Sequence, residues 1–116
     1  MARKQVLKSL WTDRLTVFAY QEVTDAYGAV THEPVVVISG EPCRLSFSTL
    51  SETGRDDAAT LVQAVKIFCD NDLDIKPGSK IAVTRGGRTF EYSRSGDPGI
   101  FDSHQEIMLV PFRGWA

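Results

Sequence analysis

The stretch IAVTRGGRTFEY at residues 81–92 decides the fold class, because it joins two strand-forming segments through a pair of glycines. Gly86 and Gly87 supply the positive φ angles that a two-residue type I′ turn requires. A loop of this length also fixes the pairing of the flanking strands, and it places apolar residues such as Val83 and Phe90 opposite each other. The sequence therefore predicts an antiparallel β-hairpin here.

Strand patterns recur along the rest of the chain. β-branched and aromatic residues dominate residues 14–20, 30–38, 43–47, 63–69 and 105–112. The stretch that ends at Cys69 also fits a helical spacing, but we favour a strand for 63–69. The first and last of these segments carry apolar residues in succession, so we expect both strands to be buried on both faces. The SGEP sequence before the third segment predicts a turn. Together with the hairpin, these segments predict a mainly β fold, a small antiparallel sandwich or barrel of six to seven strands.

We expect a single domain spanning residues 1–116. Two of its segments are not expected to be strands. Residues 1–12 form a predicted N-terminal arm with a short amphipathic helix, since apolar and basic residues alternate there at helical spacing. Residues 48–60, STLSETGRDDAAT, contain one large apolar residue among hydroxyls and charges. They cannot bury enough surface to offset ordering, so we expect a long mobile loop within the β domain.

The composition limits the class of protein. With 13 Lys and Arg against 15 Asp and Glu, the formal net charge is −2, which disfavours a typical non-specific nucleic-acid binder. No apolar run is long enough for a membrane span, and the N-terminus lacks a signal-peptide pattern, so we expect a cytoplasmic protein. Acidic residues gather in 52–74 and basic residues in 76–94, which suits head-to-tail contact between identical copies.

The two cysteines, Cys43 and Cys69, lie 26 positions apart. They have neither a CxxC spacing nor a secretory context, which argues against a disulfide framework or a zinc site. We expect both to be reduced thiols that act as small core residues.

The stretch RSGDPGIFDSHQEI at residues 94–107 concentrates ionisable groups. Asp97, Asp102, His104 and Glu106 are the candidates for acid–base chemistry or metal binding. However, the spacing matches no HExxH arrangement, and SGDPG is typical of a turn that leads into a strand. The PGSK and RGGR sequences also lack the spacing of a phosphate-binding loop. We therefore expect no catalytic, cofactor or metal site, and no enzyme activity.

Four residues are candidates for an assembly surface. The hairpin register places Arg85 and Arg88 directly opposite each other, where like charges are unfavourable. They either contact an anionic partner or extend as solvated tips. Trp11 and Trp115, near the two ends of the chain, are either anchors between subunits or pack onto the domain's own sheet.

Two long stretches, RLTVFAYQEVTDAYGAVTHEPVVVISGEPCRLSF and DIKPGSKIAVTRGGRTFEYSRSGDPGIFDSHQEIMLV, together with the final GWA, resemble the small head-completion or head–tail joining proteins of long-tailed bacteriophages and prophages. The resemblance covers nearly the whole chain. It implies a barrel-like domain that forms a connector ring with itself, between the portal or its adaptor and the tail-completion protein. It also implies a location in the host bacterial cytoplasm during assembly and then in the virion neck, with no cofactor and no membrane contact.

In such a ring, DNA passes through the lumen without sequence-specific contact. The resemblance implies that the loop at residues 48–60 projects into this channel and acts as a stopper. Its candidate residues are Leu50, Glu52, Arg55, Asp56 and Asp57. Two alternatives stay open: a tail-terminator or tail-tube-associated protein, and a nucleic-acid-binding β-barrel module.

Overall fold

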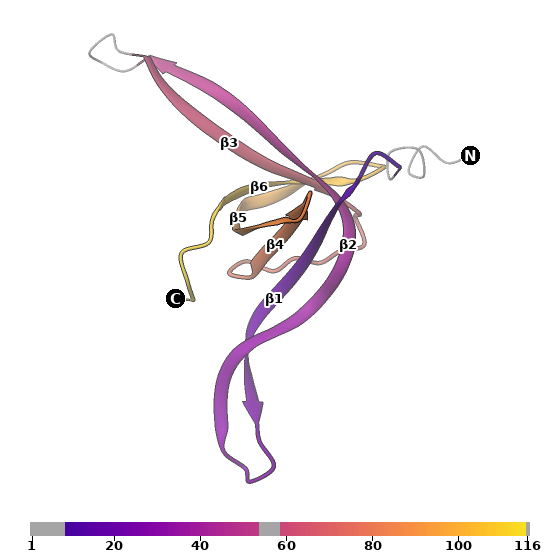
Figure 1. Cartoon of the computed structure of the whole chain (residues 1–116), viewed down its shortest axis with the longest axis vertical. Coiled ribbons are helices and arrows are strands. Elements are labelled where there is room, and N and C mark those ends of the chain that lie inside the picture. Colours follow the sequence, from indigo (N-terminus) through magenta and orange to yellow (C-terminus); the bar gives the residue numbers. More distant parts are fainter. Residues whose placement is uncertain (1–8, 54–58, 116) are drawn as a thin grey trace.

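Six strands close into an antiparallel barrel in the order β1-β2-β3-β6-β5-β4 (Figure 1). The computed structural model describes residues 9–53 and 59–115, with side chains placed for residues 9–48 and 64–115. The strands are β1 (Asp13–Thr24), β2 (Val30–Thr53), β3 (Ala59–Cys69), β4 (Lys80–Arg85), β5 (Arg88–Ile100) and β6 (Gln105–Pro111). Of the predicted architectures, the six-stranded barrel is confirmed.

The predicted N-terminal helix is not shown. Most of residues 1–12 lies outside the described part of the chain, where Ser9 and Leu10 form a turn and the next two residues have no regular structure. No helix in the described part of the chain is long and apolar enough to cross a membrane.

The β4–β5 hairpin has the predicted register. Val83 pairs with Phe90 and Arg85 pairs with Arg88. Gly86 and Gly87 both have positive φ, +55° and +79°. These residues adopt the type I′ geometry whose twist matches the flanking strands.

Replacing Gly87 by alanine should lower the free energy of unfolding by about 1–2 kcal/mol, because an L side chain is strained in the left-handed region. No atom lies within 4 Å of a Cβ placed at this position, so the loss comes from backbone conformation alone. Gly87→Asn should lose less, since asparagine tolerates positive φ. Urea denaturation compares the two variants, and equal losses would contradict the conformational explanation.

The core lies inside the barrel and is built from alternate residues of the strands. Leu45, Ile67 and Ile107 stand side by side on β2, β3 and β6, and each is at most 2% exposed. Cys43 pairs with Cys69 in the β2–β3 register, and both are fully buried free thiols. Burial raises the pKa of each thiol to about 12, so they act as core residues, as predicted.

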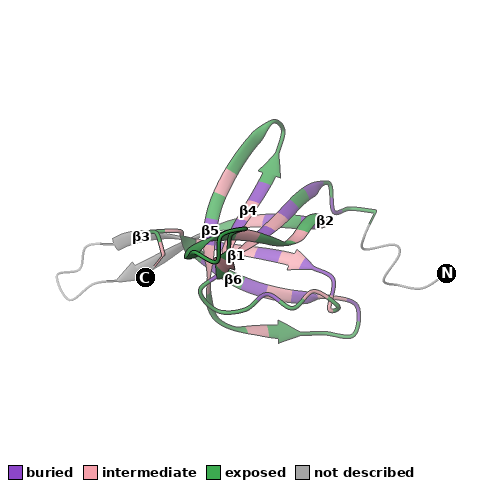
Figure 2. Cartoon of the chain, turned by 90° about the horizontal axis from the view of Figure 1, so that it is seen from below, coloured by how far each residue is buried: buried purple, intermediate pink, exposed green. Residues whose placement is uncertain are grey.

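The expectation that the first and last strands are buried on both faces is wrong. On β6, Met108 and Val110 are 42% and 43% exposed, and on β1 Tyr20 is 47% exposed. Figure 2 shows buried positions alternating with half-buried and exposed ones along the barrel strands. Each barrel strand has one inward and one outward face, and in the described part of the chain no second layer covers the outside.

Two predicted turns are irregularities inside long strands. The SGEP sequence does not end a strand: β2 continues through it, with Ser39 and Gly40 inserted opposite Thr16 as a β-bulge. Gly40 has φ +60° there, and its N–H donates to the Thr16 hydroxyl at 3.2 Å. Likewise, SGDPG lies within β5, where the register to β6 shifts between Ser95 and Gly99. The chain reverses only at residues 101–104.

The predicted loop at residues 48–60 is corrected in the same way. β2 continues to Thr53 and β3 starts at Ala59, and the two pair from Ser48↔Ala64 to Thr53↔Ala59. Within this segment, residues 54–58 lie outside the described residues. The paired backbone satisfies its own hydrogen bonds, which a composition argument about side-chain burial does not consider.

Two ribbons of two strands each project from the barrel (Figure 1). The β1–β2 ribbon starts where the β1–β4 pairing ends, at Phe18↔Lys80. The β2–β3 ribbon starts where the β3–β6 pairing ends, at Val65↔Leu109. Isolated two-stranded ribbons are marginal in water, so these ribbons depend on the barrel for their stability.

Candidate functional site

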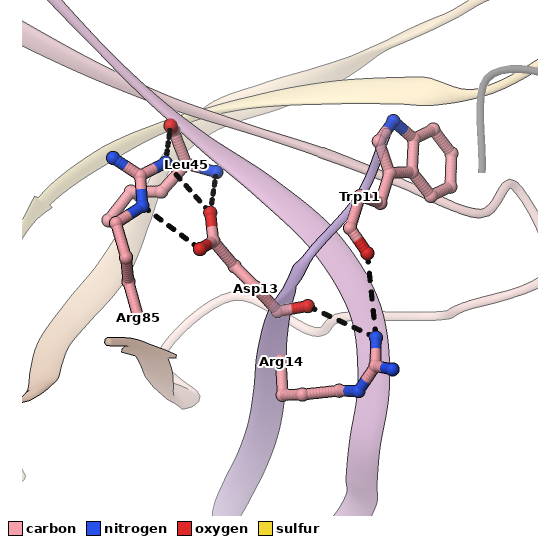
Figure 3. A network of polar contacts seen from close by, with 5 residues as sticks. All are labelled: Trp11, Asp13, Arg14, Leu45 and Arg85. Carbon is pink, nitrogen blue, oxygen red and sulfur yellow. Dashed lines mark hydrogen bonds and ion pairs between the residues drawn. The ribbon is translucent and has the colours of Figure 1, made fainter. Parts of the chain in front are cut away.

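A partly buried ion pair, with Asp13 buried and Arg85 half-exposed, joins the start of β1 to the end of β4 (Figure 3). Arg85 donates from Nε and Nη2 to the two carboxylate oxygens of Asp13, at 2.9 and 2.8 Å. Asp13 also accepts the Leu45 N–H at 2.8 Å, and Arg85 donates to the Leu45 carbonyl. Beside this network, Arg14 donates to the carbonyls of Trp11 and Asp13. The arrangement ties β1, β2 and β4 together.

The charges of this pair stabilise each other. The hydrogen bond from Arg85 lowers the pKa of Asp13, although burial opposes the shift. The same bond raises the pKa of Arg85. The anion that compensates Arg85 is thus provided by its own chain, whereas Arg88 is exposed and has no carboxylate partner among the described side chains. Of the two arginines, Arg88 is therefore the one whose charge is available for contact with another molecule.

Both tryptophans pack against their own chain. Trp11 is only 5% exposed. Trp115 is half-buried, stacks on Tyr20 with ring centroids 5.2 Å apart and meets Phe112 edge-on. Of the two interpretations of these residues, packing onto the domain's own sheet agrees with these contacts.

The ionisable residues of the 94–107 stretch are only partly brought together. His104 Nε2 lies 2.9 Å from Glu106, and its Nδ1 lies 2.9 Å from the Ser103 hydroxyl. Burial on its own would raise the pKa of Glu106, but hydrogen bonds from His104 and Lys66 bring it below its usual value. Asp97 is almost fully exposed, and Arg94 lies 3.7 Å from its carboxylate.

This series of hydrogen bonds links Ser103, His104, Glu106 and Lys66. Ser103 is only 9% exposed, and its hydroxyl lies 2.9 Å from His104 Nδ1. Lys66 neutralises Glu106 at 2.9 Å. No three histidine, cysteine or acidic side chains come together as a metal site in the part of the chain that the structure describes.

An open pocket of about 380 Å³ lies over the outer face of β2, β3 and β6. Its lining combines aromatic, aliphatic and charged side chains: Leu10, Trp11, Arg44, Ser46, Phe68, His104 and Glu106. Sequence reasoning missed Arg44 and Phe68 as pocket residues. Both occupy outward positions of predicted strands, but which outward positions are neighbours depends on the β2–β3–β6 order.

The candidate channel residues fall on and beyond the β2–β3 ribbon. Leu50 and Glu52 belong to β2, where they pair with Val62 and Thr60 of β3. Arg55, Asp56 and Asp57 lie outside the described residues.

The fold defines the chain as a small six-stranded antiparallel barrel with two projecting ribbons. No family model matches the chain, and no curated protein matches it. Among solved structures, the fold is similar to that of the phage-like element PBSX protein xkdH from Bacillus subtilis, with a TM-score of 0.51 and 14% sequence identity. The similarity covers 84% of this chain and 91% of that protein, so it extends over nearly all of both folds.

Proposed function

We propose that this protein is a structural component of the head–tail interface of a long-tailed bacteriophage or prophage. The observation that carries the proposal is the fold shared with a protein of a phage-like element, over 84% of this chain and 91% of the other. The resemblance of the sequence to head-completion proteins supports the same role. In this role the protein forms a connector ring in the virion neck that retains DNA and docks the tail, and it assembles in the host cytoplasm.

The two projecting ribbons suit a structural protein that contacts several neighbouring subunits. A ring needs contacts between its own copies and also with the portal or adaptor on one side and the tail-completion protein on the other. The β2–β3 ribbon takes the place of the predicted loop as the candidate channel element. Residues 52–57 contain Glu52, Arg55, Asp56 and Asp57, so their formal charge of −2 repels DNA phosphates and allows DNA to pass.

A nucleic-acid-binding role is less well supported. A barrel that grips single strands presents a basic groove with exposed aromatic residues. Here residues 15–43, which include the whole β1–β2 ribbon, contain no Lys or Arg and four carboxylates. This large exposed arm would repel a nucleic acid.

Electron microscopy of particles from a phage or induced prophage that lacks this gene tests the proposal. We expect free tails beside heads that packaged DNA and then lost it, and a plasmid copy of the wild-type gene should restore joined particles. Full, stable heads with absent or abnormally long tails would instead support the tail-terminator alternative. Normal infectious particles would refute a structural role.

A further inference from the structure

The β1–β2 ribbon, defined here as residues 19–38, is acidic and exposes apolar side chains. It contains three carboxylates, Glu22, Asp25 and Glu33, and no Lys or Arg. Its exposed apolar residues, each at least 46% exposed, are Tyr20, Tyr27, Val30, Val36 and Val37. Exposed apolar side chains beside charges of one sign are common on protein-binding surfaces.

The tip of the ribbon has an ordered backbone and exposes one aromatic side chain. The Asp25 carboxylate accepts the N–H groups of Tyr27 and Ala29, at 2.8 and 2.9 Å. The Asp25 N–H donates to the Ala29 carbonyl at 2.9 Å, which closes the turn. Tyr27 is nevertheless 96% exposed. A tyrosine on an ordered turn is suited to anchor an interface, because its backbone needs no further ordering and its side chain has only two χ angles to fix.

The pocket on the outer face of β2, β3 and β6 has the complementary chemistry. Phe68 supplies aromatic surface, to which Trp11, at 5% exposed, adds little, and Arg44 supplies an exposed cation. Lys66 and Glu106 neutralise each other at 2.9 Å, whereas Arg44 has no carboxylate partner among the described side chains. The volume, about 380 Å³, is at the small end of binding sites and suits one side chain better than a large ligand.

The ribbon tip and the pocket of one chain lie too far apart to meet. Trp11 lies just before β1 begins, and the tip follows the end of that strand. The 12 residues of β1 separate the two features by roughly 40 Å of extended chain. The ribbon also points away from the barrel (Figure 1). A contact between them therefore requires two molecules.

We infer that Tyr27 of one copy docks into the Trp11–Arg44–Phe68 pocket of a second copy, with the ribbon carboxylates facing Arg44. The contact joins two different surfaces, so it propagates head to tail and closes into a ring if the rotation per subunit permits. The ring role rests on the proposed function, but the contact between copies is independent of it.

Sedimentation velocity of the full-length protein over a range of concentrations tests the contact. We expect concentration-dependent self-association that Tyr27→Ser weakens at least about tenfold and Arg44→Gln weakens several-fold, as for an interface anchor and its charged neighbour. Ile100→Ser and Arg113→Gln are matched controls, since both residues are exposed and lie outside the ribbon and the pocket. A wild-type protein that stays monomeric, or variants that associate as the wild type does, would overturn the inference.

A mixing experiment tests the direction of the contact. Tyr27→Ser keeps the pocket but loses the anchor, and Ser46→Trp keeps the anchor but fills the pocket. At a concentration too low for the weakened contact to form, each variant alone should remain monomeric, while an equimolar mixture should form a 1:1 dimer that grows no further. A mixture that stays monomeric would refute the head-to-tail arrangement. Deleting residues 2–8 should not alter association, and loss of association on deletion would assign the contact to that segment instead.

These results are separable from the particle morphology that tests the proposed function. Head-to-tail association combined with normal particles would keep the contact and refute the head–tail role. Defective particles combined with a monomeric protein would do the reverse.

Discussion

Replacing Arg85 by methionine should lower the free energy of unfolding by about 3 kcal/mol, because Asp13 would keep a buried charge without its partner. Asp13 is only 2% exposed and receives two hydrogen bonds from Arg85. The arginine side chain itself is 44% exposed, so water screens part of the loss and we expect the low end of the range for a broken buried pair. Urea denaturation, extrapolated to water, measures the change.

Arg88→Met is the matched control for this variant. Arg88 lies directly opposite Arg85 in the hairpin, but it is exposed and has no ion-pair partner among the described side chains. Its replacement should change stability by less than about 0.5 kcal/mol. Asp13→Asn combined with Arg85→Met should be less destabilising than Arg85→Met alone, since no buried charge is left unpaired. Equal losses for the two arginine variants would refute the ion-pair explanation.

The same pair makes stability depend on pH. Arg85 lowers the pKa of Asp13 in the folded protein, so the unfolded chain binds this proton at a higher pH than the folded chain does. The stabilisation is therefore present above the unfolded carboxyl pKa, near 3.9, and is lost as the pH falls through the lower folded value. The difference in stability between the wild type and Arg85→Met should shrink below about pH 4, and a difference that is constant to pH 2 would exclude the carboxylate.

The hairpin could be predicted residue by residue because its information is local. Two adjacent glycines set the turn, the turn sets the register, and Val83↔Phe90 follows without reference to the rest of the chain. The strand at 63–69 and the core role of Cys43 and Cys69 also followed from alternation and from the lack of any metal or redox spacing.

The features that were missed all depend on contacts between segments that are distant in sequence. Gly40 has the composition of a turn, but β1 pairs on both sides of it and converts it into a bulge. Thr53 and Ala59 belong to paired strands because the β2–β3 register, begun inside the barrel, continues outward.

The candidate site illustrates the same limit. Asp13 and Arg85 are 72 residues apart, and nothing in either local sequence predicts that they form an ion pair. The single signal available was the unfavourable pairing of Arg85 with Arg88, which indicated that an anion was needed. The anion is Asp13, on β1 of the same chain, so this signal does not indicate a partner molecule.

Replacing Ile67 by alanine should have the largest effect of any single substitution considered, lowering the free energy of unfolding by about 3–5 kcal/mol. Ile67 is fully buried on β3, between Leu45 on β2 and Ile107 on β6. Ile67 is held by strand pairing on both sides, so the barrel wall there cannot readily collapse to fill the cavity. Thermal unfolding should show a midpoint lower by roughly 15 °C or more.

Met108→Ala is the matched control, since Met108 follows Ile107 on β6 and pairs with Lys66 beside Ile67. The same strand pair therefore carries both substitutions, one inside the barrel and one outside. With Met108 42% exposed, we expect a loss of less than about 1 kcal/mol. Comparable losses at the two positions would mean that a further layer covers β6 from outside, because the expected difference depends on Met108 being exposed while Ile67 is buried.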